Sequence, residues 1–124
     1  MFKMLNNKLY FGTLNKDKSI IKVGITSQTC WARCKNADYR ICRAIRFPNL
    51  EYYEVKALEC LMINEYRKIK KIYKGEEYFY SGSTSLKDNI EEWYSIIEKV
   101  MNVFNLKEYD YQICGTKYVT PHSY

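Results

Sequence analysis

The feature that most constrains the fold is a pair of strand-like runs, KLYFGT at 8–13 and SIIKVGIT at 19–26, separated by the polar loop LNKDK. Both runs are rich in β-branched and aromatic residues, which are enriched in strands. Apolar and polar residues alternate along the second run: Ile21, Val23 and Ile25 with Lys22, Gly24 and Thr26. This period of two predicts an antiparallel hairpin with one apolar and one polar face. A hairpin alone does not require the lysine at position 22.

The hairpin register determines what lies beside Lys22. If paired residues have numbers that sum to 32, the loop closes between Thr13 and Ser19, and Tyr10 lies opposite Lys22 with Cβ atoms about 5 Å apart. A slip by one residue would turn the apolar face toward solvent, so the parity of the pairing is constrained. An ammonium beside a phenol favours the phenolate, which would lower the tyrosine pKa toward that of a general base. An ordinary surface Tyr–Lys pair would give the same pattern.

The remaining chain alternates between helical and extended patterns. Thr26 or Ser27 is expected to cap a short helix over 28–38, and Pro48 ends a strand at 40–47. An apolar stripe at helical spacing predicts a helix over 50–72, a short strand follows at 76–80, and a third helix covers 85–104 with Ser85 at its start. Residues 114–119 are strand-like. The order predicts an α+β fold: a small mixed or antiparallel three-stranded sheet flanked by helices, a β-β-α-β-α core, with a short strand, a third helix and a C-terminal extension.

With 124 residues, the chain is expected to form one domain over 1–124, with a core at 8–80 and a C-terminal helix and tail at 81–124. It has neither a long apolar run nor a secretion signal at its start, which predicts no membrane segment and a cytoplasmic location, in the host cytoplasm or nucleoid if the protein is viral. The five cysteines are expected to be reduced and mostly buried. Neither a phosphate-binding glycine loop nor a zincin or serine-hydrolase motif is present.

The net charge of +6 is unevenly distributed. Residues 1–50 contain ten Lys/Arg against two Asp/Glu, whereas residues 51–124 contain ten against twelve. A basic half of this kind indicates an anionic partner such as nucleic acid, although solubilising charge alone would also account for it.

Three further residues suggest a site on the polar face of the hairpin. Gly24 would leave room for a ligand, and Arg33 lies in the middle of the short helix that follows. Glu59 lies one position away from the apolar stripe of the long helix, where a carboxylate could hold a divalent cation. A solvated helix glutamate is the alternative for Glu59.

The order and spacing of these motifs resemble the GIY-YIG nuclease superfamily. The resemblance rests on KLYFGT, IIKVGIT, an arginine nine residues after the glycine, ALE in the long helix, and GEEYF. It covers residues 8 to about 80 and is strongest for the branch from phages and large DNA viruses, in which the second motif reads Lys-Ile-Gly.

The resemblance implies catalytic roles for Tyr10, Lys22, Arg33 and Glu59, with Glu59 as the ligand of Mg²⁺ or Mn²⁺. Lys22 stands where most of the superfamily has a second tyrosine. Gly24 matches the motif glycine, and Glu77 matches an acid that we expect to be structural, bonded to neighbouring backbone. Tyr39 is the nearby candidate for a further proton-handling group.

The expected function is therefore metal-dependent hydrolysis of DNA by an endonuclease of viral or mobile-element type, acting as a monomer or homodimer, with RNA left open as a substrate. The residues expected to contact the nucleic-acid backbone are Lys35, Arg40, Arg43, Arg46, Arg67, Lys68, Lys70 and Lys71. For 67–71 the alternative is a solvated helix end. Two other functions stay open: an inactive nucleic-acid-binding module of the same fold, and a protein-interaction factor that inhibits a host protein.

Overall fold

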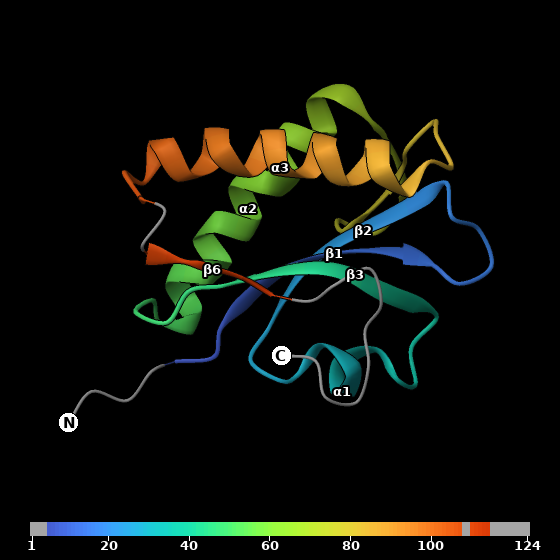
Figure 1. Cartoon of the computed structure of the whole chain (residues 1–124). Helices are drawn as coiled ribbons and strands as arrows, with labels where there is room; N and C mark the ends of the chain where they lie inside the picture. The colour runs from blue at the N-terminus through green and yellow to red at the C-terminus, as the bar shows by residue number, and fades with distance from the viewer. Residues whose placement is uncertain (1–4, 108–109, 115–124) are drawn as a thin grey trace.

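Within residues 5–107 and 110–114, which the computed structural model describes, six strands form one antiparallel sheet in the order β4-β5-β2-β1-β3-β6 (Figure 1). The strands are β1 (Lys8–Leu14), β2 (Ile20–Thr26), β3 (Tyr39–Arg46), β4 (Lys71–Lys74), β5 (Tyr78–Tyr80) and β6 (Gln112–Cys114). The predicted hairpin, β1 and β2, lies at the centre of this sheet, where both strands are paired on both sides.

Three helices flank the sheet: α1 (Cys30–Cys34), α2 (Tyr52–Ile69) and α3 (Leu86–Val103). In Figure 1, α2 and α3 cover one face of the sheet, whereas α1 lies against the other. The α3 helix begins as predicted, since the Ser85 hydroxyl accepts a hydrogen bond from the Asp88 amide at 3.2 Å. The α1 helix is shorter than predicted and is capped by Thr29, whose hydroxyl accepts from the Ala32 amide, rather than by Thr26 or Ser27.

The α+β class is confirmed, but the sheet has six strands rather than three. The sequence predicts 71–72 as the end of the long helix; in the structure α2 ends at Ile69 and the chain turns into β4, where Ile72 pairs with Phe79 of β5. The last strand, β6, covers 112–114 and pairs with β3. The strand expected at 114–119 thus begins earlier, and its residues 115–119 lie outside the described part of the chain.

Alternation along the central strands produces two separate apolar clusters. Leu9, Phe11, Ile21 and Val23 pack with the buried stripes of α2 and α3, including Trp93. Residues that point the other way join a smaller cluster beside α1: Tyr10, Leu14, Ile20, Cys30, Tyr39, Ile41 and Ala44. The period of two is thus confirmed, but the face predicted to be polar is not solvent-exposed.

The hairpin register differs from the prediction by two residues. Tyr10 pairs with Gly24, and Lys22 pairs with Gly12. The loop between the strands covers residues 15–19, and within it both the Ser19 amide and its hydroxyl donate to the Asp17 carboxylate. A shift of two keeps every side chain on its predicted face. Lys22 and Tyr10 are therefore diagonal neighbours rather than directly opposed.

Of the cysteines, Cys30 and Cys42 are buried, Cys34 is half-buried and Cys60 is exposed. Two of these four thiols are buried as predicted. Cys60 is exposed because its position lies on the solvent side of α2. Among the described helices, none has the length and apolar character needed to cross a bilayer.

Candidate active site

Lys22 lies at the centre of a polar cluster inside the smaller apolar layer. Its side chain comes from the middle of β2 and is only 3% exposed. The ammonium donates to the Tyr10 hydroxyl at 2.6 Å and to the Glu77 carboxylate at 2.9 Å. A buried ammonium requires such partners, since an unpaired one would lose its hydration without compensation. Lys22 is thus held in one place by a phenol and a carboxylate.

Tyrosine rings surround the same ammonium. The Lys22 nitrogen lies 4.9 Å from the ring centroid of Tyr10, 4.6 Å from that of Tyr39 and 5.4 Å from that of Tyr78. The rings of Tyr10 and Tyr39 stack with an interplanar angle of 3°, and their hydroxyls are 3.1 Å apart. The ammonium gains cation–π attraction in addition to its hydrogen bonds.

Gly24 leaves space for the Tyr10 ring. A Cβ built at position 24 would lie 2.5 Å from Cζ of Tyr10, well inside van der Waals contact. The sequence prediction that Gly24 leaves room for a ligand is therefore wrong: the room is occupied by Tyr10, which is fully buried. The glycine allows the phenol to lean across the neighbouring strand toward Lys22.

A β-bulge brings Tyr39 to this face. Phe11 pairs with Arg43 and Gly12 pairs with Ile41, so β3 has one extra residue, Cys42, between these pairs. Strict alternation from Ile45 would have put Tyr39 on the face of α2 and α3. Bulges near active sites often redirect a side chain in this way. The bulge makes the Tyr10–Tyr39 stack possible.

Burial controls the protonation of both tyrosines. Loss of hydration raises the pKa of Tyr10 to about 12, and this effect exceeds the opposing effects of the Tyr39 hydrogen bond and the Arg33 charge. Burial likewise raises the pKa of Tyr39, and its hydrogen bond with Tyr10 adds to the shift. The expectation of a lowered tyrosine pKa is wrong, because desolvation outweighs the nearby positive charge. Both phenols are protonated at neutral pH.

Glu59 is buried rather than placed at the border of the core. Its side chain is 1% exposed, because position 59 follows Val55 by four residues and precedes Met62 by three, which puts it on the apolar stripe of α2. Lys56, one turn earlier, donates to its carboxylate at 2.9 Å. Burial raises the pKa of Glu59, the Lys56 hydrogen bond opposes this, and the charge of Glu77 raises the pKa further. The charge interactions of Glu59 with Glu77 and Lys22 connect α2 to the cluster.

Arg33 reaches the cluster from α1. It is exposed, and its guanidinium carbon lies 5.9 Å from the ring centroid of Tyr39. Its charge also acts on Tyr10 and Glu77. The side chain is therefore available to an anion that approaches the stacked tyrosines from solvent.

Glu77 bonds to Lys22 rather than to backbone through its side chain. The prediction of a backbone-bonded structural acid is wrong in this respect; the backbone carbonyl of Glu77 does accept from the Val23 amide at 3.1 Å. The carboxylate is 36% exposed, so it lies at the border between the buried lysine and solvent.

Five of the predicted site residues lie in this cluster or interact with it. Tyr10, Lys22 and Glu77 are in direct contact, Arg33 adjoins them through Tyr39, and Glu59 interacts with them by charge. Sequence reasoning did not assign Tyr78 to the site. Its signal is the alternation in β5, which places Tyr78 and Tyr80 on the face opposite to Phe79.

Glu59 and Glu77 are the two carboxylates of the site that could bind a metal. Among the described residues, no group of three or more His, Cys, Asp or Glu side chains is arranged to hold a metal. Glu59 and Glu77 are two hard oxygen donors that repel each other electrostatically. Carboxylate oxygens are the donors that Mg²⁺ and Mn²⁺ prefer in proteins, where these ions also retain several waters.

The basic residues predicted to contact nucleic acid do not form one surface. Lys35 and Arg40 line a pocket of about 190 Å³ near Tyr39 and Trp31. Arg46 lies further along β3 and donates to the backbone carbonyl of Leu5.

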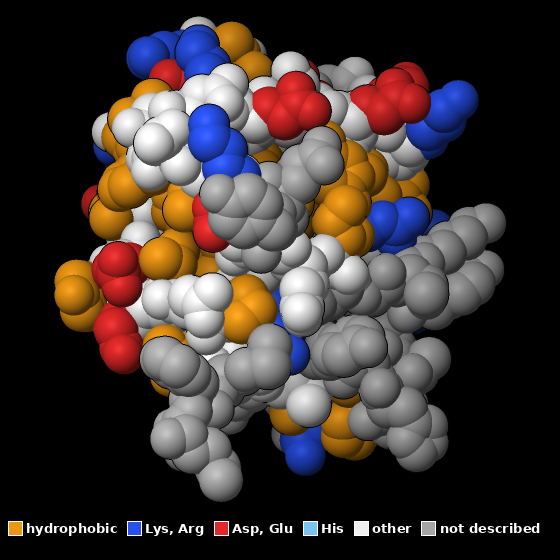
Figure 2. Space-filling model, turned by 60° about the vertical axis from the view of Figure 1, so that its left-hand side comes forward, with side chains coloured by type: hydrophobic (Ala, Val, Ile, Leu, Met, Phe, Trp, Pro, Cys, Tyr) orange, Lys and Arg blue, Asp and Glu red, His pale blue; other side chains and the backbone are white. Residues whose placement is uncertain are grey.

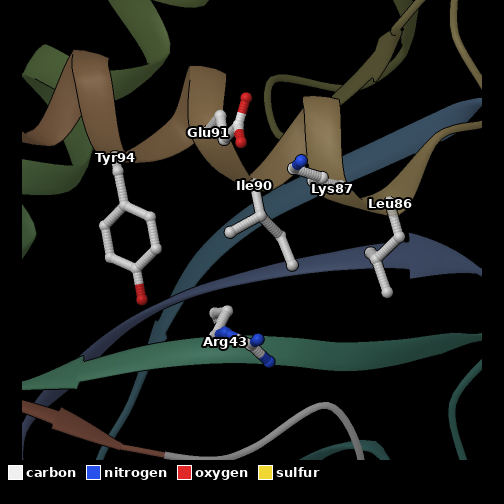
Figure 3. A pocket seen from close by; sticks show the side chains of 6 residues that line it. All are labelled: Arg43, Leu86, Lys87, Ile90, Glu91 and Tyr94. Atoms are coloured by element: carbon white, nitrogen blue, oxygen red, sulfur yellow. The ribbon is translucent and has the colours of Figure 1, made fainter.

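Arg43 lies on the other face of the sheet. It lines a pocket of about 530 Å³ together with side chains that point from α3 toward β3, among them Leu86, Ile90 and Tyr94 (Figure 3). This pocket is separate from the Lys22 cluster, which lies on the face of α1.

The RKIKK run divides between helix and strand. Arg67, Lys68 and Lys70 lie at the end of α2 and contact Glu76, Glu65 and Glu92, respectively. Lys71 is exposed in β4. In the view of Figure 2, Lys/Arg and Asp/Glu side chains are interspersed over the described surface.

Comparison of the chain with protein-family models, with curated proteins and with solved structures gives no match.

Proposed function

We propose that this protein is a metal-dependent endonuclease that hydrolyses phosphodiester bonds, with DNA as its substrate and a viral or mobile-element origin. One observation carries the proposal: Tyr10 and Glu77, which are far apart in the sequence, both bond to Lys22. Arg33 lies near the ring of Tyr39, and Glu59 interacts with Lys22 and Glu77 by charge. A buried ammonium–phenol pair could supply the base of phosphodiester hydrolysis, the exposed arginine could stabilise the developing charge, and the acids could bind a metal.

The proposed roles follow from charge and position. When bound at Glu59, Mg²⁺ or Mn²⁺ would polarise the phosphate and stabilise the leaving 3′-oxygen. Tyr10 must first lose its own proton to solvent. The phenolate, which the Lys22 ammonium at 2.6 Å would stabilise, then accepts the proton of the attacking water and returns to the neutral phenol. Arg33 neutralises the charge that grows on the non-bridging oxygens. Glu77 keeps the ammonium of Lys22 in position.

The high pKa of Tyr10 modifies this mechanism. With a pKa of about 12, about one Tyr10 side chain in 10⁵ is ionised at pH 7. The phenolate is therefore a strong but rare base, and proton transfer from water is expected to limit the rate at neutral pH.

One observation favours a second function, a nucleic-acid-binding module without catalysis. Each carboxylate of the site already has a lysine partner at 2.9 Å, Lys56 for Glu59 and Lys22 for Glu77. A metal ion must compete with these ammonium groups, so weak metal binding would leave binding without hydrolysis.

The deciding experiment is conversion of supercoiled plasmid to nicked product in Mg²⁺, in Mn²⁺ and in EDTA, with structured RNA as a parallel substrate. Glu59→Gln is the test variant. Glu65→Gln is the matched control, because Glu65 is on the same helix and also pairs with a lysine three residues away. We expect metal-dependent nicking that only Glu59→Gln abolishes. Salt-sensitive binding without nicking in either metal would favour the binding module instead.

A further inference from the structure

Three tyrosines form an aromatic cluster at the β4–β5 end of the sheet. The ring of Tyr73 meets that of Tyr80 edge-on at 5.4 Å between centroids, and it lies 6.5 Å from that of Tyr78. Phe79, between the two β5 tyrosines, points to the other face and stacks on Tyr66 at 5.4 Å. Tyr78 and Tyr80 therefore share the face that carries Lys22.

These rings are held in place but remain accessible. Tyr73 and Tyr78 pack against the cluster around Tyr10 and are half-buried, whereas Tyr80 is 44% exposed. A ring that belonged to the core alone would be buried like Phe79. The arrangement supplies aromatic surface to solvent at low conformational cost, because the neighbouring rings restrict each other.

Lysines border the aromatic cluster. The Lys74 ammonium lies 4.9 Å from the Tyr78 ring centroid, and Lys71 is exposed on β4 opposite Tyr80. Lys74 also lies 3.6 Å from Asp38, but both side chains are exposed, and a contact of this kind is weak. The cations are therefore available to an incoming anion.

The cluster is continuous with the proposed active site. An open hollow of about 400 Å³ is lined by the β4–β5 turn, residues 74–78, which includes both Glu77 of the proposed site and Tyr78 of the aromatic cluster. Tyr78 lies 5.4 Å from the Lys22 ammonium, which bonds to Glu77. A strand bound beside Glu77, which lies at the border between Lys22 and solvent, would pass Tyr78 within a nucleotide or two.

We propose that Tyr73, Tyr78 and Tyr80 form a stacking platform for unpaired bases of a nucleic-acid strand whose phosphates contact Lys71 and Lys74. Exposed aromatic faces beside basic side chains are how single strands are held without sequence readout. The proposal rests on the proposed function and refines its substrate: single-stranded regions, flaps or frayed ends bind in preference to uniform duplex, because paired bases cannot reach the rings.

The test measures binding in EDTA, where cleavage does not interfere. Fluorescence anisotropy compares three labelled ligands of equal length: a single strand, the same strand with abasic central positions, and the duplex. We expect the base-bearing strand to bind most tightly. Tyr80→Ala should weaken its binding about fivefold or more and leave the abasic strand unaffected. Tyr53→Ala is the control, because Tyr53 is 74% exposed on α2 and contributes nothing to the platform.

A second pair of variants guards against misfolding. Tyr80→Phe keeps the ring and should retain binding, whereas Tyr80→Leu keeps apolar surface without the ring and should lose it. Equal affinity for base-bearing and abasic strands, or equal behaviour of the Phe and Leu variants, overturns the platform. Absence of binding to every strand also overturns it and would direct attention to a protein partner at the β4 edge.

The outcomes separate this inference from the proposed function. Glu59-dependent nicking without base-dependent binding would leave the nuclease intact and remove the platform. Base-dependent binding without nicking in any metal would keep the platform and remove the nuclease.

Discussion

Replacing Gly24 with alanine tests whether the glycine exists to admit the Tyr10 ring. The new Cβ would lie 2.5 Å from Cζ of a ring that is fully buried and stacked on Tyr39. Overpacking of this kind costs about 1–3 kcal/mol. Alanine should otherwise help a strand by about 0.5–1 kcal/mol, because glycine loses more chain entropy on folding. The net expectation is a loss of up to about 2.5 kcal/mol, with a central value of about 1 kcal/mol.

The same substitution should become harmless when the ring is absent. In a Tyr10→Leu background, the Cβ at position 24 meets no phenol, and we expect Gly24→Ala to be neutral or slightly stabilising. The coupling energy between the two positions is then about 2 kcal/mol, well above the roughly 0.5 kcal/mol within which independent sites add.

Urea unfolding of the four proteins of this double-mutant cycle measures the coupling, with equal m-values as the condition for comparing midpoints. If the two single costs simply added, the steric account of Gly24 would be refuted. An additive cycle with a large Gly24→Ala cost would place the conflict in the backbone instead.

Three other predictions follow from the site and the core. In single-turnover assays the nicking rate should rise close to tenfold per pH unit from pH 7 to 10, because the reactive form of Tyr10 is deprotonated and its pKa of about 12 lies above that range. A plateau near pH 8 would contradict the role of Tyr10 as the base. Burial raises the pKa of Glu59, so the ionised carboxylate destabilises the folded state above that pKa. Glu59→Gln should therefore raise the free energy of unfolding in urea by about 0.5–2 kcal/mol at pH 7, because the exposed Lys56 can be hydrated when its partner is lost. The gain should vanish in acid, where the carboxyl group is protonated in both states. Asn89→Ala should lower the free energy of unfolding by about 1–3 kcal/mol, because the buried Asn89 side chain accepts a hydrogen bond from the Ser81 hydroxyl and donates one to the Ser83 carbonyl. The control Asn64→Ala, at an exposed position of α2, should cost less than about 0.5 kcal/mol. Thermal unfolding measures both.

The hairpin could be predicted from sequence because alternation and turn composition are local. The face of each residue followed from the parity of the strand, so Tyr10 and Lys22 were expected together despite a register error of two. The register itself depends on Gly24 and on the loop around Asp17, and neither is encoded in the alternation. Strand β4 was missed because Ile72 continues an apolar spacing that also suits a helix.

Features that depend on tertiary contacts could not be predicted. The bulge at Cys42 reverses the face of Tyr39, and an alternating pattern gives no sign of an inserted residue. The direction of the Tyr10 pKa shift depends on burial, which follows only when α1 and the neighbouring tyrosines close over the strand. The burial of Glu59 was within reach of sequence reasoning, since its spacing from Val55 and Met62 places it on the stripe.

The short β5 strand has a consequence for the timing of motions in the molecule. Only three residues of β5 pair with β2, and the Val23 amide donates a hydrogen bond to the Glu77 carbonyl. Only the four-residue strand β4 lies outside β5, and short strands near the edge of a sheet open far more often than a whole domain unfolds. The Val23 amide should then exchange with solvent deuterium through this local opening, faster than the amides between β1 and β3. Each opening of the β5–β2 pairing would separate Glu77 from Lys22. The Lys22–Glu77 ion pair would therefore break and re-form at the rate at which β5 opens and closes.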